Sequence, residues 1–262
     1  MKLPRQELLE DSQNPEGLEK ILIQAEKVLN TWESSWSPFI AAPLREEALQ
    51  KIASLAEVNC FADGGYPGAE RQRIRIERSE KKTSPLDNPA PLKGIRVKGN
   101  FLFDKASPRD FRNSLETIGA SIDELGDLWV YGDRGAQAIC SPEGARFLHG
   151  KLGLIRDVQI TCEEIDKRDL HLPKQRIERQ FTTIEASLRL DAIASAGFGI
   201  SRAKILKYLE SGTLRLNWNP VSKSSKELVA GDQLQLEGRG MIQVISLGIT
   251  KKHRWRVDML LK

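Results

Sequence analysis

The spacing of the apolar positions changes along the chain, and its first stretch has the spacing of amphipathic helices. The apolar residues there recur every three or four positions: Leu18, Ile21, Leu22, Ala25, Val28, Leu29, Leu44, Ala48, Ile52 and Leu55. This period places them along one face of a helix, with Pro43 as a break. A turn-forming run rich in Gly, Asp and Pro follows at residues 62–68. The pattern predicts a helical N-terminal segment over residues 1–67.

Strand-like alternation follows this segment. Residues 71–78 alternate like a strand with one polar face, and residues 79–91 form a loop rich in Lys, Ser and Pro. From residue 95 to residue 165 the periods follow the order strand, helix, strand, strand, helix, strand. This β-α-β-β-α-β order is that of the ferredoxin-like plait, an α/β plait that we expect over residues 68–170.

Two aromatic residues in the first plait strand raise the question of base stacking. The plait is also the scaffold of RNA-recognition domains, which stack bases on aromatic residues of the two central strands. Residues 95–103 include Phe101 and Phe103, but residues 136–140 of the third strand carry no aromatic side chain. Because same-face apolar residues of a strand usually pack against the helices, we expect both phenylalanines in the core.

Residues 181–247 predict a small module of two helices on a small sheet. The first helix is expected to end at Gly197, Ser201 has the side-chain oxygen of an N-cap for the second, and Gly212 fits the C-terminal stop of the second. Strands are expected at residues 213–218, 233–236 and 241–247, with a turn at residues 219–220. Residues 248–262 are interpreted as a basic C-terminal extension. The whole chain is therefore predicted to be an α+β protein.

The positive charge of the chain is concentrated in its last third. Residues 181–262 hold 13 lysines and arginines against 7 acidic residues, whereas the preceding residues hold 27 against 29. A local excess of this kind is typical of a surface for phosphate. Within it, Arg202 and Lys204 stand in the first turn of a helix, next to free backbone N–H groups and the positive end of the dipole, and Lys207 follows one turn later. A bound phosphate would neutralise these groups, which makes this helix start a candidate site.

The residues that most often bind metals or act as nucleophiles are widely spaced. They are Cys60, Cys140, Cys162, His149, His171 and His253. This spacing predicts neither a disulfide framework nor a zinc site, so we expect reduced thiols and structural or surface histidines. No glycine-rich strand-to-helix loop for a nucleotide cofactor is present, and no cofactor is expected.

The N-terminal residues lack an apolar stretch of signal-peptide length. No run of residues approaches the roughly 18 apolar positions of a membrane span. We therefore expect no membrane insertion and a cytoplasmic protein, or a stromal one if the chain is organellar.

Several pieces of the last third resemble the RNA-binding domain named after the small-subunit ribosomal protein S-four. The resemblance lies in residues 187–191, the helix start at residues 201–202, Gly212 before a strand ending in Asn217, and residues 229–232. Many such domains have Asn-Gly where this chain has Asn217-Trp218. In S-four domains the two helices and the following strand form one face that docks on structured RNA. The resemblance implies that this face includes Arg189, Asp191, Ser201, Arg202, Lys204, Lys207, Arg215, Asn217, Trp218 and Arg239.

The resemblance extends over the whole chain. It rests on residues 64–71, 109–110, 118–119, 125–128 and 251–254, which are similar to those of the bacterial YlmH family. The photosynthetic branch of that family is labelled photosystem II S-four domain proteins. The resemblance implies a monomeric protein that binds structured rRNA or tRNA on the large ribosomal subunit, near peptidyl-tRNA, in the rescue of stalled translation.

Two other classes of function compete with this interpretation. An RNA-modifying enzyme with an appended S-four domain is one, because Arg189-Leu190-Asp191 is similar to the catalytic Arg-Leu-Asp of pseudouridine synthases. The triplet lies inside the small module itself, and only a short tail follows it, so we expect no enzymatic activity. An assembly factor linked to photosystem II or to cell division is the other, and no amphipathic anchor in the sequence favours it.

Overall fold

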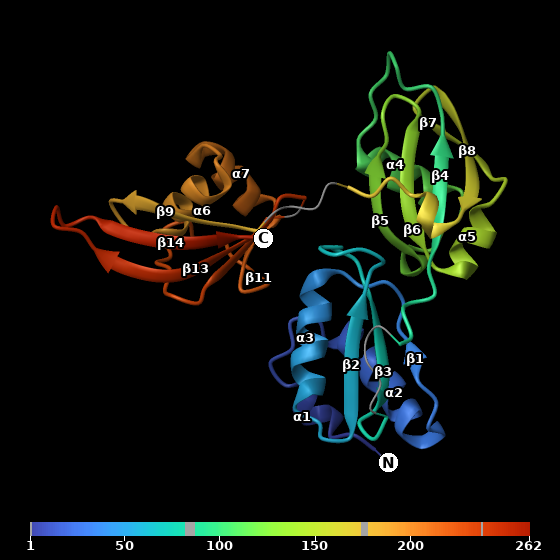
Figure 1. Cartoon of the computed structure of the whole chain (residues 1–262), viewed down its shortest axis with the longest axis horizontal. Coiled ribbons are helices and arrows are strands. Elements are labelled where there is room, and N and C mark those ends of the chain that lie inside the picture. The colour runs from blue at the N-terminus through green and yellow to red at the C-terminus, as the bar shows by residue number, and fades with distance from the viewer. Residues whose placement is uncertain (1, 82–86, 174–177, 237) are drawn as a thin grey trace. The chain divides into compact units, whose positions relative to one another are not determined.

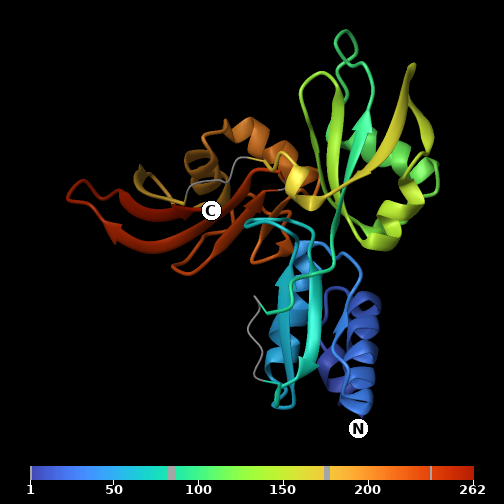
Figure 2. The same ribbon diagram turned by 45° about the vertical axis from the view of Figure 1, so that its right-hand side comes forward.

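The computed structural model describes residues 2–81, 87–173, 178–236 and 238–262. It divides into two compact units, residues 1–174 and residues 175–262, and each is treated by itself below. Helices and antiparallel sheets occur in both units, which confirms the α+β class (Figures 1 and 2).

The first unit begins with three helices packed against a three-stranded sheet. The helices are α1 (Arg5–Leu9), α2 (Pro15–Thr31) and α3 (Ala42–Ala53), and the sheet has the order β1 (Ser35–Trp36), β3 (Arg73–Arg78), β2 (Val58–Asp63). The Asn14 side chain caps α2 by accepting from the backbone N–H of Gly17 at 3.1 Å. Apolar residues of α2 and α3 pack with Val58, Ile74 and Ile76 in one core.

The predicted boundary between residues 67 and 68 is wrong. Strand β2 lies within the stretch predicted to be helical, and it pairs along its whole length with β3, from Val58 opposite Arg78 to Asp63 opposite Arg73. A boundary at residue 67 would therefore divide a single hairpin. The sequence of β2 has no clear alternation, and its strand structure comes from pairing with a segment ten residues further on. Residues 82–86 of the loop predicted after β3 lie outside the described residues.

The second part of this unit is the predicted plait. Its elements are β4 (Lys93–Lys98), α4 (Pro108–Thr117), the short helix η1 (Ile122–Glu124), β5 (Leu125–Val130), β6 (Gly135–Cys140), α5 (Pro142–Leu148), β7 (Leu152–Ile155), β8 (Val158–Ile165) and the short helix η2 (Lys167–Asp169). The antiparallel sheet has the order β5-β6-β4-β8-β7. Without the added edge strand β7, this is the strand order of the ferredoxin-like plait, so the predicted topology is confirmed.

The prediction for the two phenylalanines is half confirmed. Strand β4 ends at Lys98, so both residues lie in the loop after it. Phe101 is 3% exposed, and its ring lies 4.8 Å from that of Phe111 in the plait core. Phe103 is 94% exposed, which contradicts its predicted core position. The alternation was extended too far, because β4 ends at Lys98 and the chain bends at residues 102–104.

The last unit is one sheet with both of its helices on the same face. Its elements are β9 (Arg179–Glu185), α6 (Leu190–Phe198), α7 (Arg202–Glu210), β10 (Leu214–Leu216), β11 (Asn219–Pro220), β12 (Gln233–Leu236), β13 (Gly240–Ile249) and β14 (Trp255–Leu261). The antiparallel sheet has the order β11-β10-β12-β13-β14-β9. Apolar residues of α6 and α7 pack with alternate residues of the strands, such as Leu214, Leu234, Ile242 and Val257.

Two boundaries in this unit differ from their predictions. Helix α6 continues to Phe198 and ends at Gly199, whose φ of 65° only glycine adopts at no cost, so Gly197 is not its stop. Gly197 is instead needed for packing, since a Cβ there would lie 2.4 Å from a side-chain carbon of Ile242. The turn after β10 is Asn217-Trp218, with φ of 50° and 66°, and not residues 219–220.

Residues 248–262 are not an extension. They complete β13, form the turn at residues 250–254 and provide β14, which is hydrogen-bonded to β13 on one side and to β9 on the other. The module therefore includes β9 at its beginning and β14 at its end. The basic composition of these residues disguised their alternation of Trp255, Val257, Met259 and Leu261 toward the core.

Candidate nucleic-acid interface

The start of α6 is built around an ion pair between Arg189 and Asp191. The Arg189 guanidinium donates to both carboxylate oxygens of Asp191, at 3.0 and 3.1 Å. The Asp191 side chain is 9% exposed, whereas that of Arg189 is 43% exposed. The hydrogen bond from Arg189, together with the positive charges of Arg189 and Arg202, holds the pKa of Asp191 below its ordinary value. Asp191 therefore positions Arg189 at the surface, and its own carboxylate is already engaged.

The start of α7 matches its predicted position but not its predicted cap. Ser201 is the N-cap residue by backbone conformation, yet its hydroxyl makes no cap hydrogen bond. Its carbonyl oxygen accepts from the N–H groups of Lys204 and Ile205, at 2.9 and 3.0 Å. The predicted side-chain cap is therefore wrong. Among the described residues no side chain accepts from the N–H groups of Arg202 and Ala203, which leaves these two available to an anion.

The three predicted cations of α7 do not share one face. Lys204 and Lys207 are three residues apart and lie on the exposed side, opposite the buried Ile205 and Leu209. Arg202 is two residues before Lys204, so it points to another side, and its charge acts on Asp191 of α6. The helix thus presents one pair of lysines outward, while Arg202 and Arg189 form a second pair of cations around Asp191.

Asn217 has a structural role in the turn after β10. Its side-chain amide donates to Asp232 at 2.8 Å and accepts from the N–H of Gln233 at 2.8 Å. The other oxygen of Asp232 accepts from the N–H of Val229 at 2.9 Å. The two pieces of the S-four resemblance around residues 217 and 229–232 therefore contact each other. Asn217 is exposed, but its polar groups are committed to this turn.

Arg215 and Trp218 lie beside Gln235 on the face of the sheet that lacks helices. Arg215 is paired in register with Gln235. The side-chain oxygen of Gln235 accepts from the backbone N–H of Trp218 at 2.9 Å. The Arg215 Nε and the Gln235 Nε2 are buried without a hydrogen-bond partner in the described structure. Because both donors are buried, neither is accessible to a ligand in this conformation.

The remaining predicted residue, Arg239, lies exposed in the turn between β12 and β13. Sequence reasoning missed Lys223 and Lys226, which lie in the loop that closes over the start of α6. In that loop the Lys226 carbonyl accepts from the Leu190 N–H at 2.8 Å, and Glu227 forms an isolated bridge with Arg189. Both lysines are exposed. Nothing in the local sequence indicates that this loop lies next to residue 189, some 35 positions earlier.

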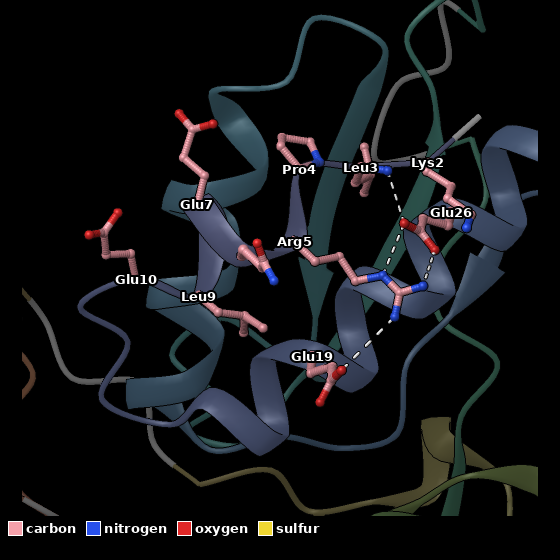
Figure 3. Close-up of a pocket in the computed structure, with 10 residues that line it drawn as sticks. Lys2, Leu3, Pro4, Arg5, Glu7, Leu9, Glu10, Glu19 and Glu26 are labelled. Atoms are coloured by element: carbon pink, nitrogen blue, oxygen red, sulfur yellow. Dashed lines mark hydrogen bonds and ion pairs between the residues drawn. The ribbon is translucent and has the colours of Figure 1, made fainter.

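A hollow beside α1 in the first unit shows no comparable set of available groups. Arg5 donates to both oxygens of Glu26, at 3.0 and 2.6 Å, and lies 3.9 Å from Glu19 (Figure 3). The backbone N–H of Leu3 also donates to the Glu26 carboxylate, at 2.9 Å. These charges are satisfied by one another and hold the N-terminal residues against α2.

The cysteines and histidines are dispersed, as the sequence indicates. All three cysteines are free thiols, and burial raises the pKa of Cys60 to about 12 and that of Cys162 to about 11. Among the described residues, no cluster of three or more His, Cys, Asp or Glu side chains is placed to hold a metal ion. The same residues contain no helix with the length and apolar character of a membrane span.

Comparison with known proteins concerns first the N-terminal part of the chain. Residues 13–81 match the family model described as YlmH, N-terminal. The chain has a YlmH-type N-terminal domain. The match ends three residues after β3 and so contains the whole β2–β3 hairpin, in agreement with a boundary after β3 and not at residue 67. The resemblance to the YlmH family is thereby confirmed.

Two further proteins are similar over longer stretches. The ribosome-associated protein quality control protein P2 of Bacillus subtilis (strain 168) is 29% identical over 216 residues, which are 82% of each chain. The solved structure of the cell division protein ylmH from Streptococcus pneumoniae is 16% identical with a TM-score of 0.48, over 60% of this chain and 93% of that one.

Proposed function

We propose that this YlmH-type protein is an RNA-binding factor of the large ribosomal subunit, which binds rRNA or tRNA in ribosome-associated quality control or the rescue of stalled translation. The name of the Bacillus subtilis relative supports the ribosomal setting. The basic last third of the chain supports RNA as the partner. The proposal includes a monomeric protein in the cytoplasm, or in the stroma if the chain is organellar.

The start of α7 is the observation that carries the proposal. The free N–H groups of Arg202 and Ala203 lie there at the positive end of the helix dipole, and Lys204 and Lys207 point outward from the same exposed helix start. Arg202 and Arg189 add two cations around the neighbouring end of α6, where Asp191 fixes the Arg189 side chain. Such a helix start stabilises a bound phosphate group, and water alone gives it no such stabilisation.

The arrangement around Asp191 supports a binding function over an RNA-modifying one. A catalytic aspartate must reach the substrate base, whereas this carboxylate is 9% exposed and bonded to Arg189 through both oxygens. The similarity of Arg189-Leu190-Asp191 to a pseudouridine synthase motif is therefore explained by the start of a helix. We accordingly propose that the protein is not an enzyme.

Sedimentation tests the proposal directly. In a low-salt gradient the full chain should sediment with large ribosomal subunits, and high salt should remove it, because phosphate contacts release counterions. Crosslinking in cells followed by sequencing of the attached RNA should recover rRNA or tRNA. Sedimentation as free protein only, at every salt concentration, would refute the ribosomal setting.

A further inference from the structure

The turn between β13 and β14 is closed by its backbone and by one threonine. The Thr250 N–H donates to the Arg254 carbonyl at 2.8 Å, and the His253 N–H donates to the Thr250 carbonyl at 2.9 Å. The Thr250 hydroxyl adds two hydrogen bonds to the backbone of Arg254, at 3.0 and 3.1 Å. The side chains of Lys251, Lys252 and Arg254 therefore have no part in holding this turn.

These three cations lack acidic partners. All are exposed, and none forms an ion pair with a residue that the structure describes. The next cation, Arg256, is paired at 3.3 Å with Asp258, whose carboxylate also accepts from Ser246 and Thr182. Like charges so close together repel one another, so the fold gains no stability from their presence.

The turn stands clear of the core that the rest of the unit shares. The fully buried core side chains of this hairpin nearest the turn are Val244 on β13 and Val257 on β14, and Leu247 and Trp255 pack against that core while partly exposed. Beyond them, Ile249 is 67% exposed and pairs in register with the half-buried Trp255. The hairpin continues past the helices as an arm in both views (Figures 1 and 2). A partner can therefore reach the turn without any rearrangement of the unit.

We propose that the β13–β14 turn is a second phosphate-binding contact for RNA, on an element other than the α7 start, with Lys251, Lys252 and Arg254 as the binding side chains. The inference rests on the proposed RNA-binding function and adds a contact to it. Three flexible cations on a rigid turn suit the regularly spaced charges of an RNA backbone, where phosphate contacts fix position and orientation. The exposed Ile249 supplies an apolar surface beside them for a ribose or base.

The test compares three full-length variants that lose charge in different places. The turn variant is Lys251→Gln with Lys252→Gln and Arg254→Gln, and the helix variant is Arg202→Gln with Lys204→Gln. The control, Lys20→Gln with Lys27→Gln and Lys105→Gln, removes three exposed charges from the first unit. Binding to purified bacterial large ribosomal subunits is measured from low to high salt, with thermal unfolding as the test of folding.

The turn variant should bind on the order of tenfold more weakly at low salt, with a log-log salt slope shallower by about two to three units. The control should match the wild type, and the turn and helix effects should add. A turn variant equal to the control overturns this inference while the wild-type binding still supports the proposed function. Absence of wild-type binding overturns the proposed function itself. If the turn variant instead loses binding only to phosphatidylglycerol vesicles, the turn is a lipid contact and the inference is wrong.

Discussion

The carboxylate of Asp127 accepts a hydrogen bond from the backbone N–H of Arg71 at 2.9 Å, across 56 residues of sequence. The same carboxylate accepts from the Tyr66 hydroxyl at 2.6 Å and from the Glu70 N–H at 2.8 Å. In return the Arg71 guanidinium donates to the carbonyls of Leu125, Phe39 and Ile122, at 2.8 to 2.9 Å. Two of the segments that carry the YlmH resemblance, residues 64–71 and 125–128, thus form one joint within the first unit.

Removal of this carboxylate should destabilise the first unit. Asp127→Ala leaves two backbone N–H groups and one hydroxyl without their acceptor, and each half-buried donor so exposed costs about 1–3 kcal/mol. We expect a total loss of about 2–4 kcal/mol, since the loop can relax in part. Urea unfolding is followed by the fluorescence of Trp129, whose ring centroid lies 6.1 Å from that of Tyr66.

Asp157 offers a matched control for this substitution, because it is exposed in the turn between β7 and β8. Asp157→Ala should change the free energy of unfolding by less than about 0.5 kcal/mol. Equal losses for the two variants would mean that the hydrogen bonds between residues 64–71 and 125–128 do not stabilise the first unit.

Substitution of Ser201 should have little effect, contrary to what its position in the sequence suggests. An N-cap hydroxyl that bonds to the first turn contributes about 0.5–2 kcal/mol, but the Ser201 hydroxyl makes no such bond. Ser201→Ala should therefore cost less than about 0.5 kcal/mol. Asn14→Ala is the comparison, because Asn14 does cap its helix and should cost about 1 kcal/mol. Thermal unfolding of both variants gives the contrast, and a loss at Ser201 as large as that at Asn14 would show that the hydroxyl caps α7 in solution.

The ion pair at the start of α6 should make the last unit sensitive to acid. The pKa of Asp191 is lowered in the folded protein, first of all by the hydrogen bond from Arg189. A carboxyl group with a lowered folded pKa stabilises the fold at pH values above its unfolded pKa, about 3.9, and this contribution is lost as the pH falls through the folded pKa. In Asp191→Asn, stability should be lower at neutral pH and should fall less steeply between about pH 4 and pH 2. Unfolding at a series of pH values measures both slopes, and parallel curves would exclude a role for this pair.

Charge removal at α7 should separate binding from folding. Arg202→Gln with Lys204→Gln removes two cations from the positive end of a helix dipole, so thermal stability should stay equal or rise slightly. Affinity for large ribosomal subunits should fall, and the log-log salt slope should become shallower by about one to two units. A variant that loses stability while it keeps the wild-type affinity and slope would show that the two side chains are structural.

The sequence predicts elements well where the signal is local. The plait order and the positions of α7 and β12 follow from periodicity and turn residues, because those features are written into neighbouring positions. Strand β2 and the β9–β14 pairing were missed or misread, because their partners lie 10 to 82 residues away and no local pattern specifies a pairing.

The same difference between local features and features that depend on distant partners holds for the candidate site. Lys204 and Lys207 lie exposed on α7, as their helical positions require. The roles of Asp191 and Asn217 were not foreseen, since both depend on partners that only the fold brings together. A polar residue close to a motif can therefore stabilise the fold while its neighbour stays exposed.

Substitution of Trp218 tests whether its side chain contributes to RNA binding and not to stability. Trp218 has a φ of 66°, where a non-glycine residue costs roughly 1–2 kcal/mol, and Asn-Gly is the sequence that such a turn prefers. Trp218→Gly should therefore leave stability equal or higher by about 0.5–1 kcal/mol, after the loss of the half-buried ring is counted. If the indole stacks on RNA, affinity for large ribosomal subunits should fall by about 1–3 kcal/mol, which is the usual contribution of one stacked base.

Trp32 is the matched control, because it has a φ of 62° and is 57% exposed in the first unit. Trp32→Gly loses a contact with Arg78 but should leave the affinity unchanged. Calorimetric unfolding and subunit binding are measured on the same preparations. A Trp218→Gly variant that binds as the wild type does would show that the tryptophan is tolerated in this turn and is not part of the RNA-binding face.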